Sequence, residues 1–291
     1  MRTDGLFTYH RHVEQVRLDQ PIHLCPVSDI HRDNELHAES EYQDWLRYAT
    51  TERKRDLFIG LGDANDFARA HVRAFLGSSE HGKSVDDALQ KQAKAHSDLV
   101  VTELRPIAKR FIGWMSGNHY FVFTDKQRGV ETRTHSDEYI AGKLGCPYLG
   151  TMSRITITLQ SGNKSADLRI IAHHGAGGGT TVAGGLNRVV RMMNGWEGVD
   201  IGLMGDNHQR GVVPLGEQLD VREQSGRERI TVKRRFAART GSFLRGFEVG
   251  KSSYVVDACY DPTSIGTVEF ELRLKTCPRT GHAYVSVRAI T

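Results

Sequence analysis

The sequence of 291 residues predicts an α/β fold. Strand-like apolar runs alternate with amphipathic segments of helical periodicity, and five of the strand-like runs end in groups rich in His, Asp and Asn. An apolar fraction of 38% is sufficient for an ordinary globular core. We therefore expect a sheet architecture covered by helices, with a polar site where the strands end.

The five strand-like runs share an aliphatic or aromatic body and a polar end. They are Ile22–Val27 before Asp29 and His31, Leu57–Leu61 before Asp63, Phe111–Met115 before Asn118 and His119, Leu168–Ala172 before His173 and His174, and Ile201–Met204 before Asp206 and His208. Ligand sites in open α/β sheets lie at the carboxyl ends of strands. The five polar ends are therefore expected to converge in one crevice.

Two segments between these strands have helix-forming composition. Residues 35–55 and 85–110 carry apolar side chains three or four positions apart, which is the spacing of an amphipathic helix. Residues 77–84 between them are rich in Gly and Ser and predict a loop. Each helix is expected to cover one face of a sheet.

The C-terminal third contains two more strand-like runs, Ile230–Ala237 and Thr267–Leu274. No linker-like break precedes them. We therefore expect a single domain over residues 1–291, in which residues 211–291 complete a second sheet.

The N-terminal residues contain no apolar leader, and no apolar run approaches the length of a membrane span. These features predict a cytoplasmic protein without membrane contact. The four cysteines lie far apart in the sequence, so we expect reduced thiols rather than a zinc ribbon or a redox motif.

Positive charge is concentrated in residues 221–246, which hold eight Lys or Arg against two Glu, whereas the whole chain has a net charge of +4. Phe236 and Phe243 are interleaved with these charges, and Phe247 follows them. Such a segment could bind the phosphates and bases of DNA or RNA. The alternative interpretation is a solvated face of a hairpin.

The polar strand ends carry ligand types that suit divalent metal ions. Asp29 and His31 are separated by one residue, and alternate residues of an extended chain point the same way, so both could hold one ion. Asp63 could bridge two ions through its two oxygens. Further ligands follow the other strands, namely Asn118, His173, Asp206 and His208. This mixture of imidazole and oxygen ligands predicts two divalent ions, with Mn²⁺ favoured and Fe, Zn²⁺ or Mg²⁺ as alternatives.

Taken in order, these motifs resemble the signature of the calcineurin-like metallophosphoesterase superfamily. The matching motifs are Asp29-x-His31, Gly62-Asp63, Gly117-Asn118-His119, His173-His174 and Gly205-Asp206-x-His208. Segment Gly241-Ser242-Phe243 is similar to phage-type members. The resemblance implies a four-layer αββα sandwich, in which two mixed sheets are flanked by helices.

The resemblance also implies a role for each matching residue. The implied ligands are Asp29, His31 and His208 at the first metal, Asp63 as the bridge, and Asn118, His173 and Asp206 at the second metal. His119 matches the catalytic histidine, which contacts the phosphate or protonates the leaving oxygen. The implied reaction is hydrolysis of a phosphoester by a hydroxide that the two metals activate.

Two positions depart from the usual pattern of the superfamily. Asp206 stands where a histidine is usual, which adds negative charge at the second metal and favours harder ions. Tyr120 stands where an acidic residue usually follows the catalytic histidine, so the residue that orients His119 is not evident from the sequence. Of the two adjacent histidines, we favour His173 as the ligand because it follows the strand directly. His174 and Tyr120 are then candidate substrate contacts.

The metal ligands do not determine which ester is cleaved. The basic segment 221–246 favours a phosphodiesterase that acts on nucleic acid. A phosphomonoesterase or nucleotide phosphatase is an alternative. A non-catalytic scaffold that binds a protein partner is an alternative of another class.

Overall fold

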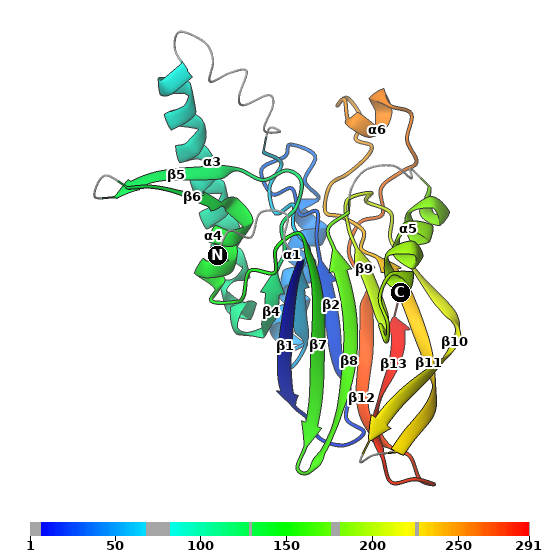
Figure 1. Cartoon of the computed structure of the whole chain (residues 1–291). Coiled ribbons are helices and arrows are strands. Elements are labelled where there is room, and N and C mark those ends of the chain that lie inside the picture. Colours follow the sequence, from blue (N-terminus) through cyan, green and yellow to red (C-terminus); the bar gives the residue numbers. More distant parts are fainter. Residues whose placement is uncertain (1–6, 68–81, 128–129, 176–180, 225–226, 291) are drawn as a thin grey trace.

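The computed structural model describes residues 7–67, 82–127, 130–175, 181–224 and 227–290. Its strands form two large sheets, with helices on both sides of the pair (Figure 1). A two-stranded hairpin, β5 (Val122–Gln127) and β6 (Val130–His135), extends away from the sheets beside helix α3 (Gly82–Leu104).

The six-stranded sheet combines parallel and antiparallel pairs. Its order is β1 (Phe7–Gln15), β7 (Met152–Ser161), β8 (Lys164–His173), β9 (Ile201–Met204), β11 (Arg227–Arg239) and β10 (Gly211–Gln224). β8, β9 and β11 are parallel neighbours, so their carboxyl ends lie at the same edge.

The five-stranded sheet is also mixed. Its order is β13 (Ala283–Ile290), β12 (Glu269–Thr276), β2 (Ile22–Val27), β3 (Leu57–Gly60) and β4 (Phe111–Trp114). β2, β3 and β4 run parallel, which places the segments that follow them side by side. All five strands that were predicted to deliver site residues are therefore present.

Apolar side chains of both sheets meet between them and form the largest core. Ile59 and Phe270 of the five-stranded sheet and Ile157 and Ile170 of the six-stranded sheet are fully buried in it. Burial of one such side chain contributes roughly 1.5–3 kcal/mol. Strand alternation leaves the opposite face of each sheet to be covered by helices.

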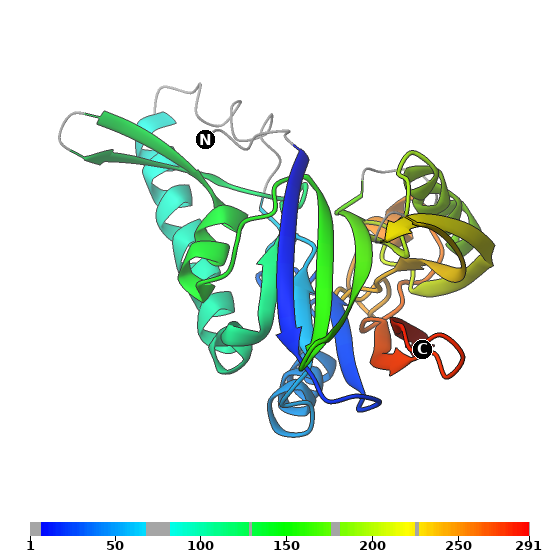
Figure 2. The same cartoon turned by 60° about the horizontal axis from the view of Figure 1, so that its bottom comes forward.

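Helices α1 (Glu39–Thr51), α3 and α4 (Ser136–Leu144) pack on the outer face of the five-stranded sheet. Helix α5 (Val182–Asn194) packs on the outer face of the six-stranded sheet. Figure 2 shows these helices on the two opposite sides of the strands. The expected four-layer αββα arrangement is confirmed.

Helix α3 ends earlier than the sequence predicted. Its buried positions Ala93, Val100, Val101 and Leu104 have the expected helical spacing. Residues Arg105–Arg110 then continue as a 3₁₀ helix, because Pro106 has no N–H for an α-helical hydrogen bond. Within the loop predicted over 77–84, residues from 82 onward belong to α3, and residues 77–81 lie outside the described part of the chain.

The C-terminal third contributes to both sheets rather than completing only one. β10 and β11 extend the six-stranded sheet beyond β9, whereas β12 and β13 extend the five-stranded sheet beyond β2. Residues 211–291 thus add strands to both sheets, and the single-domain organisation stays a prediction. Within the described ranges, no helix is both long and apolar enough to cross a lipid bilayer.

Candidate metal centre

A first group of buried side chains unites the ends of β2 and β9. Nε2 of His208 lies 3.3 Å from Oδ1 of Asp29 and 3.3 Å from Nε2 of His31. All three residues are at most 5% exposed. Their ligand atoms lie within 4.8 Å of one another, so one ion could contact all three.

A second group shares Asp29 and adds residues from the ends of β3 and β8. Nε2 of His174 lies 3.0 Å from Oδ2 of Asp63, and both side chains are buried. Nδ1 of His174 donates to the carbonyl oxygen of Leu61 at 2.7 Å, which leaves Nε2 as the ligand atom of the neutral ring. Asp29 belongs to both groups and Asp63 to one, so the bridging role of Asp63 stays a prediction.

The structure places His174, and not His173, in this cluster. His173 is the last residue of β8 and lies on the same face as Ile171, which packs under α5. His174 continues the side of Ala172, which belongs to the core between the sheets. Nδ1 of His173 accepts a hydrogen bond from the N–H of Gly175 at 2.8 Å. The geometry therefore favours His174 over His173 as the ligand, because strand alternation turns the side chain of His173 away.

Asp206 and Asn118 meet at the edge of the second group. The amide of Asn118 donates to Oδ1 of Asp206 at 2.6 Å, and the same carboxylate oxygen lies 4.0 Å from Nε2 of His174. The N–H of Asp206 donates to both oxygens of Asp29. Both residues are thus close to the second group, and their coordination of a metal stays a prediction.

The backbone at these strand ends adopts an unusual conformation. Among the described residues, seven that are not glycine have a positive φ, and five of these are predicted metal ligands. The five φ values are 52° at Asp29, 47° at His31, 52° at Asp63, 71° at Asp206 and 54° at His208. Such conformations cost about 1–3 kcal/mol each and are concentrated at functional sites. The strained backbone at these five positions therefore directs their side chains toward the cluster.

Two glycines in the motifs are required by close approach rather than by flexibility. A Cβ on Gly117 would lie 1.9 Å from Oδ1 of Asp63. A Cβ on Gly205 would lie 2.6 Å from Oδ2 of Asp29. Only a residue without a Cβ leaves room for a carboxylate at these distances. This explains why glycine precedes Asn118 and Asp206.

His119 is held by a residue that the sequence did not single out. Its Nδ1 lies 2.5 Å from Oδ1 of Asp66, and its backbone N–H donates to Asp63 at 2.9 Å. Oδ1 of Asp66 also lies 3.8 Å from Nδ1 of His31. The signal in the sequence was an aspartate three residues after Asp63. Asp66 thus places a carboxylate against Nδ1 of His119, whereas the residue that follows His119 in the sequence is Tyr120.

Tyr120 lies beside the site but turns toward the hairpin. Its ring lies on His135 with centroids 3.8 Å apart. Asp137 at the start of α4 accepts hydrogen bonds from the N–H of Gly117 and from Nε1 of Trp114, which fixes the loop that carries His119. A contact between Tyr120 and substrate stays a prediction.

Two further residues near the centre were not predicted from the sequence to belong to it. Tyr254, the first residue of the short helix α6 (Tyr254–Asp257), places its hydroxyl 2.7 Å from Nδ1 of His208. Arg239, at the end of β11, is 2% exposed and donates to the carbonyl oxygens of Gly205 and Gly185. Both lie behind ligand positions, where such groups orient ligands.

The charges in the cluster shift its titration strongly. Burial opposes the protonated form of His174, but the attraction of Asp63 outweighs it and raises the pKa of His174 to about 10. Burial likewise opposes the charged form of Asp63, yet His174 holds the pKa of that carboxyl below its ordinary value. Without metal, the pair is therefore an imidazolium and a carboxylate, and a metal at Nε2 must displace a proton.

The first group differs, because its histidines repel each other. Burial and the neighbouring His208 lower the pKa of His31 to about 4. Burial opposes the charged form of Asp29, but the hydrogen bond to His208 and its charge hold the pKa of Asp29 well below its usual range. His31 is therefore neutral and Asp29 ionised at neutral pH, which are the forms that bind metal.

The donor set fits divalent transition metals. Three carboxylates, three imidazoles and one amide face the same region, and no cysteine is among them. Such mixed nitrogen and oxygen sites suit Mn²⁺, Fe²⁺ and Zn²⁺. The side chains could thus hold divalent ions, while the choice of metal stays open.

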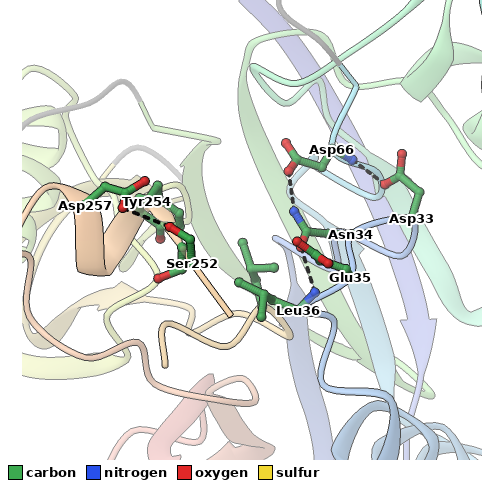
Figure 3. A pocket seen from close by; sticks show the side chains of 10 residues that line it. Asp33, Asn34, Glu35, Leu36, Asp66, Ser252, Tyr254 and Asp257 are labelled. Carbon is green, nitrogen blue, oxygen red and sulfur yellow. Dashed lines mark hydrogen bonds between the residues drawn. The ribbon is translucent and has the colours of Figure 1, made fainter. Parts of the chain in front are cut away.

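A cleft of about 430 Å³ adjoins the centre (Figure 3). Asp66, which contacts His119, lines one side together with residues 33–36, and Tyr254, which contacts His208, lines the other with Ser252 and Asp257. Its described lining contains four carboxylates and no Lys or Arg, the carboxylates being Asp33, Glu35, Asp66 and Asp257. A bound group would therefore experience negative potential.

No protein-family model matches the sequence, and no curated protein matches it. Among solved structures, Vps29 from Entamoeba histolytica in complex with Zn²⁺ is 14% identical over 92% of this chain and 98% of its own, with a TM-score of 0.35. GAP50, the anchor in the inner membrane complex of Plasmodium, is 12% identical over 93% of this chain and 89% of its own, with a TM-score of 0.37. At such TM-scores neither likeness carries an argument about the site.

Proposed function

We propose that this chain is a metal-dependent phosphoester hydrolase that prefers phosphodiesters. The observation that supports this most is the pair of buried Asp and His groups that share Asp29 and lie beside the contact of His119 with Asp66. The sequence motifs at the same positions resemble those of metallophosphoesterases. Strained backbone at five of the ligand positions supports a functional rather than a structural cluster.

The side chains would divide the work by position. The first group, Asp29, His31 and His208, would hold one divalent ion, and Asp63, His174, Asp206 and Asn118 would hold another. When bound, such ions lower the pKa of water and neutralise phosphoryl oxygens. His119, oriented by Asp66, would donate a proton or hydrogen bond to the leaving oxygen. His174 would fix its neutral tautomer through Leu61.

The cleft beside His119 supports a substrate with an extended alcohol part. The leaving group would receive a proton from Nε2 of His119, whose Nδ1 contacts Asp66, a residue that lines this cleft. The carboxylates of the cleft would repel further phosphates, and they would accept hydrogen bonds from hydroxyl or ammonium groups. We therefore propose a diester whose leaving alcohol is uncharged or cationic.

Binding of DNA or RNA to segment 221–246 stays a prediction. Three of its described basic side chains already have partners within the protein. Lys233 pairs with Asp200, Arg245 pairs with Glu41, and Arg239 is buried against backbone carbonyls. These contacts favour a small diester over a polynucleotide.

The direct test measures metal content and turnover together. Elemental analysis after loading with Mn²⁺ should find two ions per chain, and bis(p-nitrophenyl) phosphate should be cleaved faster than p-nitrophenyl phosphate. His119→Ala should keep both ions and lose roughly a hundredfold or more in kcat. His282→Ala, far from the cluster, is the matched control and should change neither the metal content nor kcat.

Other outcomes would redirect the proposal. Faster cleavage of the monoester would make the chain a phosphomonoesterase. Metal binding without turnover on any mono- or diester would support the non-catalytic scaffold. Failure to bind any divalent metal would refute the proposed function.

A further inference from the structure

Arg239 is a buried cation without a carboxylate partner. Its side chain is 2% exposed, and in the described part of the chain no carboxylate forms an ion pair with it. Nη2 donates to the carbonyl oxygen of Gly205, and Nη1 donates to that of Gly185 at 3.4 Å. Burying a charge without a counter-charge is costly, so a compensating negative potential is expected nearby.

The compensating charge lies on the other side of a single peptide group. The carbonyl of Gly205 and the N–H of Asp206 belong to the same peptide. The carbonyl accepts from Arg239, whereas the N–H donates to Asp29 at 3.1 and 3.2 Å. The peptide dipole is therefore aligned between a guanidinium and a buried carboxylate, and it is favourable to both.

The carboxylate at the far end is the one that both candidate metal groups share. Asp63 and Asp206 lie in the same cluster, so three carboxylates face one another behind this peptide. Thr240, which directly follows β11, reinforces the arrangement through Ser28, whose hydroxyl donates to Asp29. The end of β11 thus supports Asp29 by charge and by hydrogen bonds.

The packing around the guanidinium is specific. A Cβ on Gly185 of α5 would lie 2.8 Å from Cδ of Arg239 and 2.3 Å from Nδ2 of Asn207. Only glycine at this position lets α5 cover the guanidinium and its acceptors. The cation is therefore enclosed between α5 and the site rather than exposed to solvent.

We propose that Arg239 is the built-in counter-charge of the metal centre. It is a positioning residue, which holds the three carboxylates together in the folded protein before metal binds. The inference rests on the proposed function, because it assigns Arg239 a role toward the same centre. A fixed positive charge compensates the carboxylates when no ion is present and repels an ion that arrives. Arg239 therefore stabilises the metal-free protein and limits its affinity for divalent ions.

The test compares charge removal with charge retention in the full chain. Arg239→Met keeps the aliphatic stem and removes the charge, whereas Arg239→Lys keeps the charge. Arg110→Met is the matched control, because Arg110 also donates to two backbone carbonyls, those of Arg53 and Ala49, away from the centre. Thermal midpoints would be measured with chelator and with saturating Mn²⁺, and Mn²⁺ affinity by calorimetry.

Arg239→Met should lower the midpoint of the metal-free protein more than that of the Mn²⁺-loaded protein, and it should bind Mn²⁺ roughly tenfold tighter. The thermal midpoints and the Mn²⁺ affinity of Arg239→Lys should remain closer to those of the wild type. Arg110→Met should lower both midpoints equally and leave the affinity unchanged. Weaker Mn²⁺ binding by Arg239→Met, or equal losses in both states, would overturn the proposal, because Arg239 would then only hold the loop.

A variant that does not fold is also informative. If Arg239→Met is unfolded without metal, the double variant with Asp206→Asn removes one negative charge as well. Recovery of folding in the double variant would support the counter-charge, and no recovery would refute it. A wild-type protein that binds no metal would count against the proposed function. If the wild type binds metal but Arg239→Met binds Mn²⁺ more weakly, or loses the same midpoint in both states, only the role of Arg239 is refuted.

Discussion

Oδ1 of Asp66 lies 2.5 Å from Nδ1 of His119, so a carboxylate that follows β3 orients a histidine that follows β4. Asp66 is ionised under ordinary conditions. Burial opposes this, but its hydrogen bond to His119 holds the pKa of the carboxyl well below its usual range. The contact fixes the ring and leaves Nε2 available for the proposed contact with substrate.

Asp66→Asn should lower kcat by roughly ten- to a hundredfold while both metal ions remain bound. The amide keeps the shape but loses the charge that orients and polarises His119. Steady-state kinetics with a chromogenic diester and metal analysis would measure the two effects. Asp87→Asn on the exposed face of α3 is the control. Loss of metal in Asp66→Asn would contradict an orienting role.

His174→Gln should weaken Mn²⁺ binding by at least roughly tenfold, whereas His173→Gln should leave it near the wild-type value. His174 faces Asp63 at 3.0 Å, while His173 lies on the face covered by α5. Calorimetric titration of both variants makes a matched comparison. The assignment fails if His173→Gln has the larger effect.

The metal-free protein should lose stability as the pH rises from 6.5 toward about 10. The pKa of His174 is raised by folding, so the folded state holds its proton more tightly than the unfolded state in this window. The stabilisation is complete below pH 6.5 and disappears as the proton leaves. Thermal midpoints in chelator would measure it, and His174→Gln should flatten the slope. An unchanged slope in that variant would assign the effect to other groups.

Asp206→His should shift metal preference from Mn²⁺ toward Zn²⁺ without loss of the fold. Imidazole is the softer ligand, and the change also removes one of three carboxylates around His174. Competition between the two metals, read by elemental analysis, would measure the ratio. Asp44→His on the exposed surface of α1 places the same substitution outside the cluster as a control. An unchanged ratio would place Asp206 outside the coordination shell.

The sequence by itself determined which segments form strands and which residue types follow them. Local apolar runs such as Ile22–Val27 specify a strand, and the polar residues after it are fixed by chain connectivity. The four-layer arrangement was expected from the resemblance and agrees with the cores between and outside the sheets. The sheets that the C-terminal strands join were less predictable, because long-range contacts decide which strands pair.

Only the tertiary structure decided how the individual side chains of the site are used. His173 and His174 are adjacent in sequence, and the burial of Ala172 between the sheets turns His174 toward Asp63. Asp66 and Arg239 reach the centre from different strand ends, which no local pattern shows. Distances between side chains far apart in sequence, and the desolvation that makes their charges interact strongly, arise only when the sheets pack together.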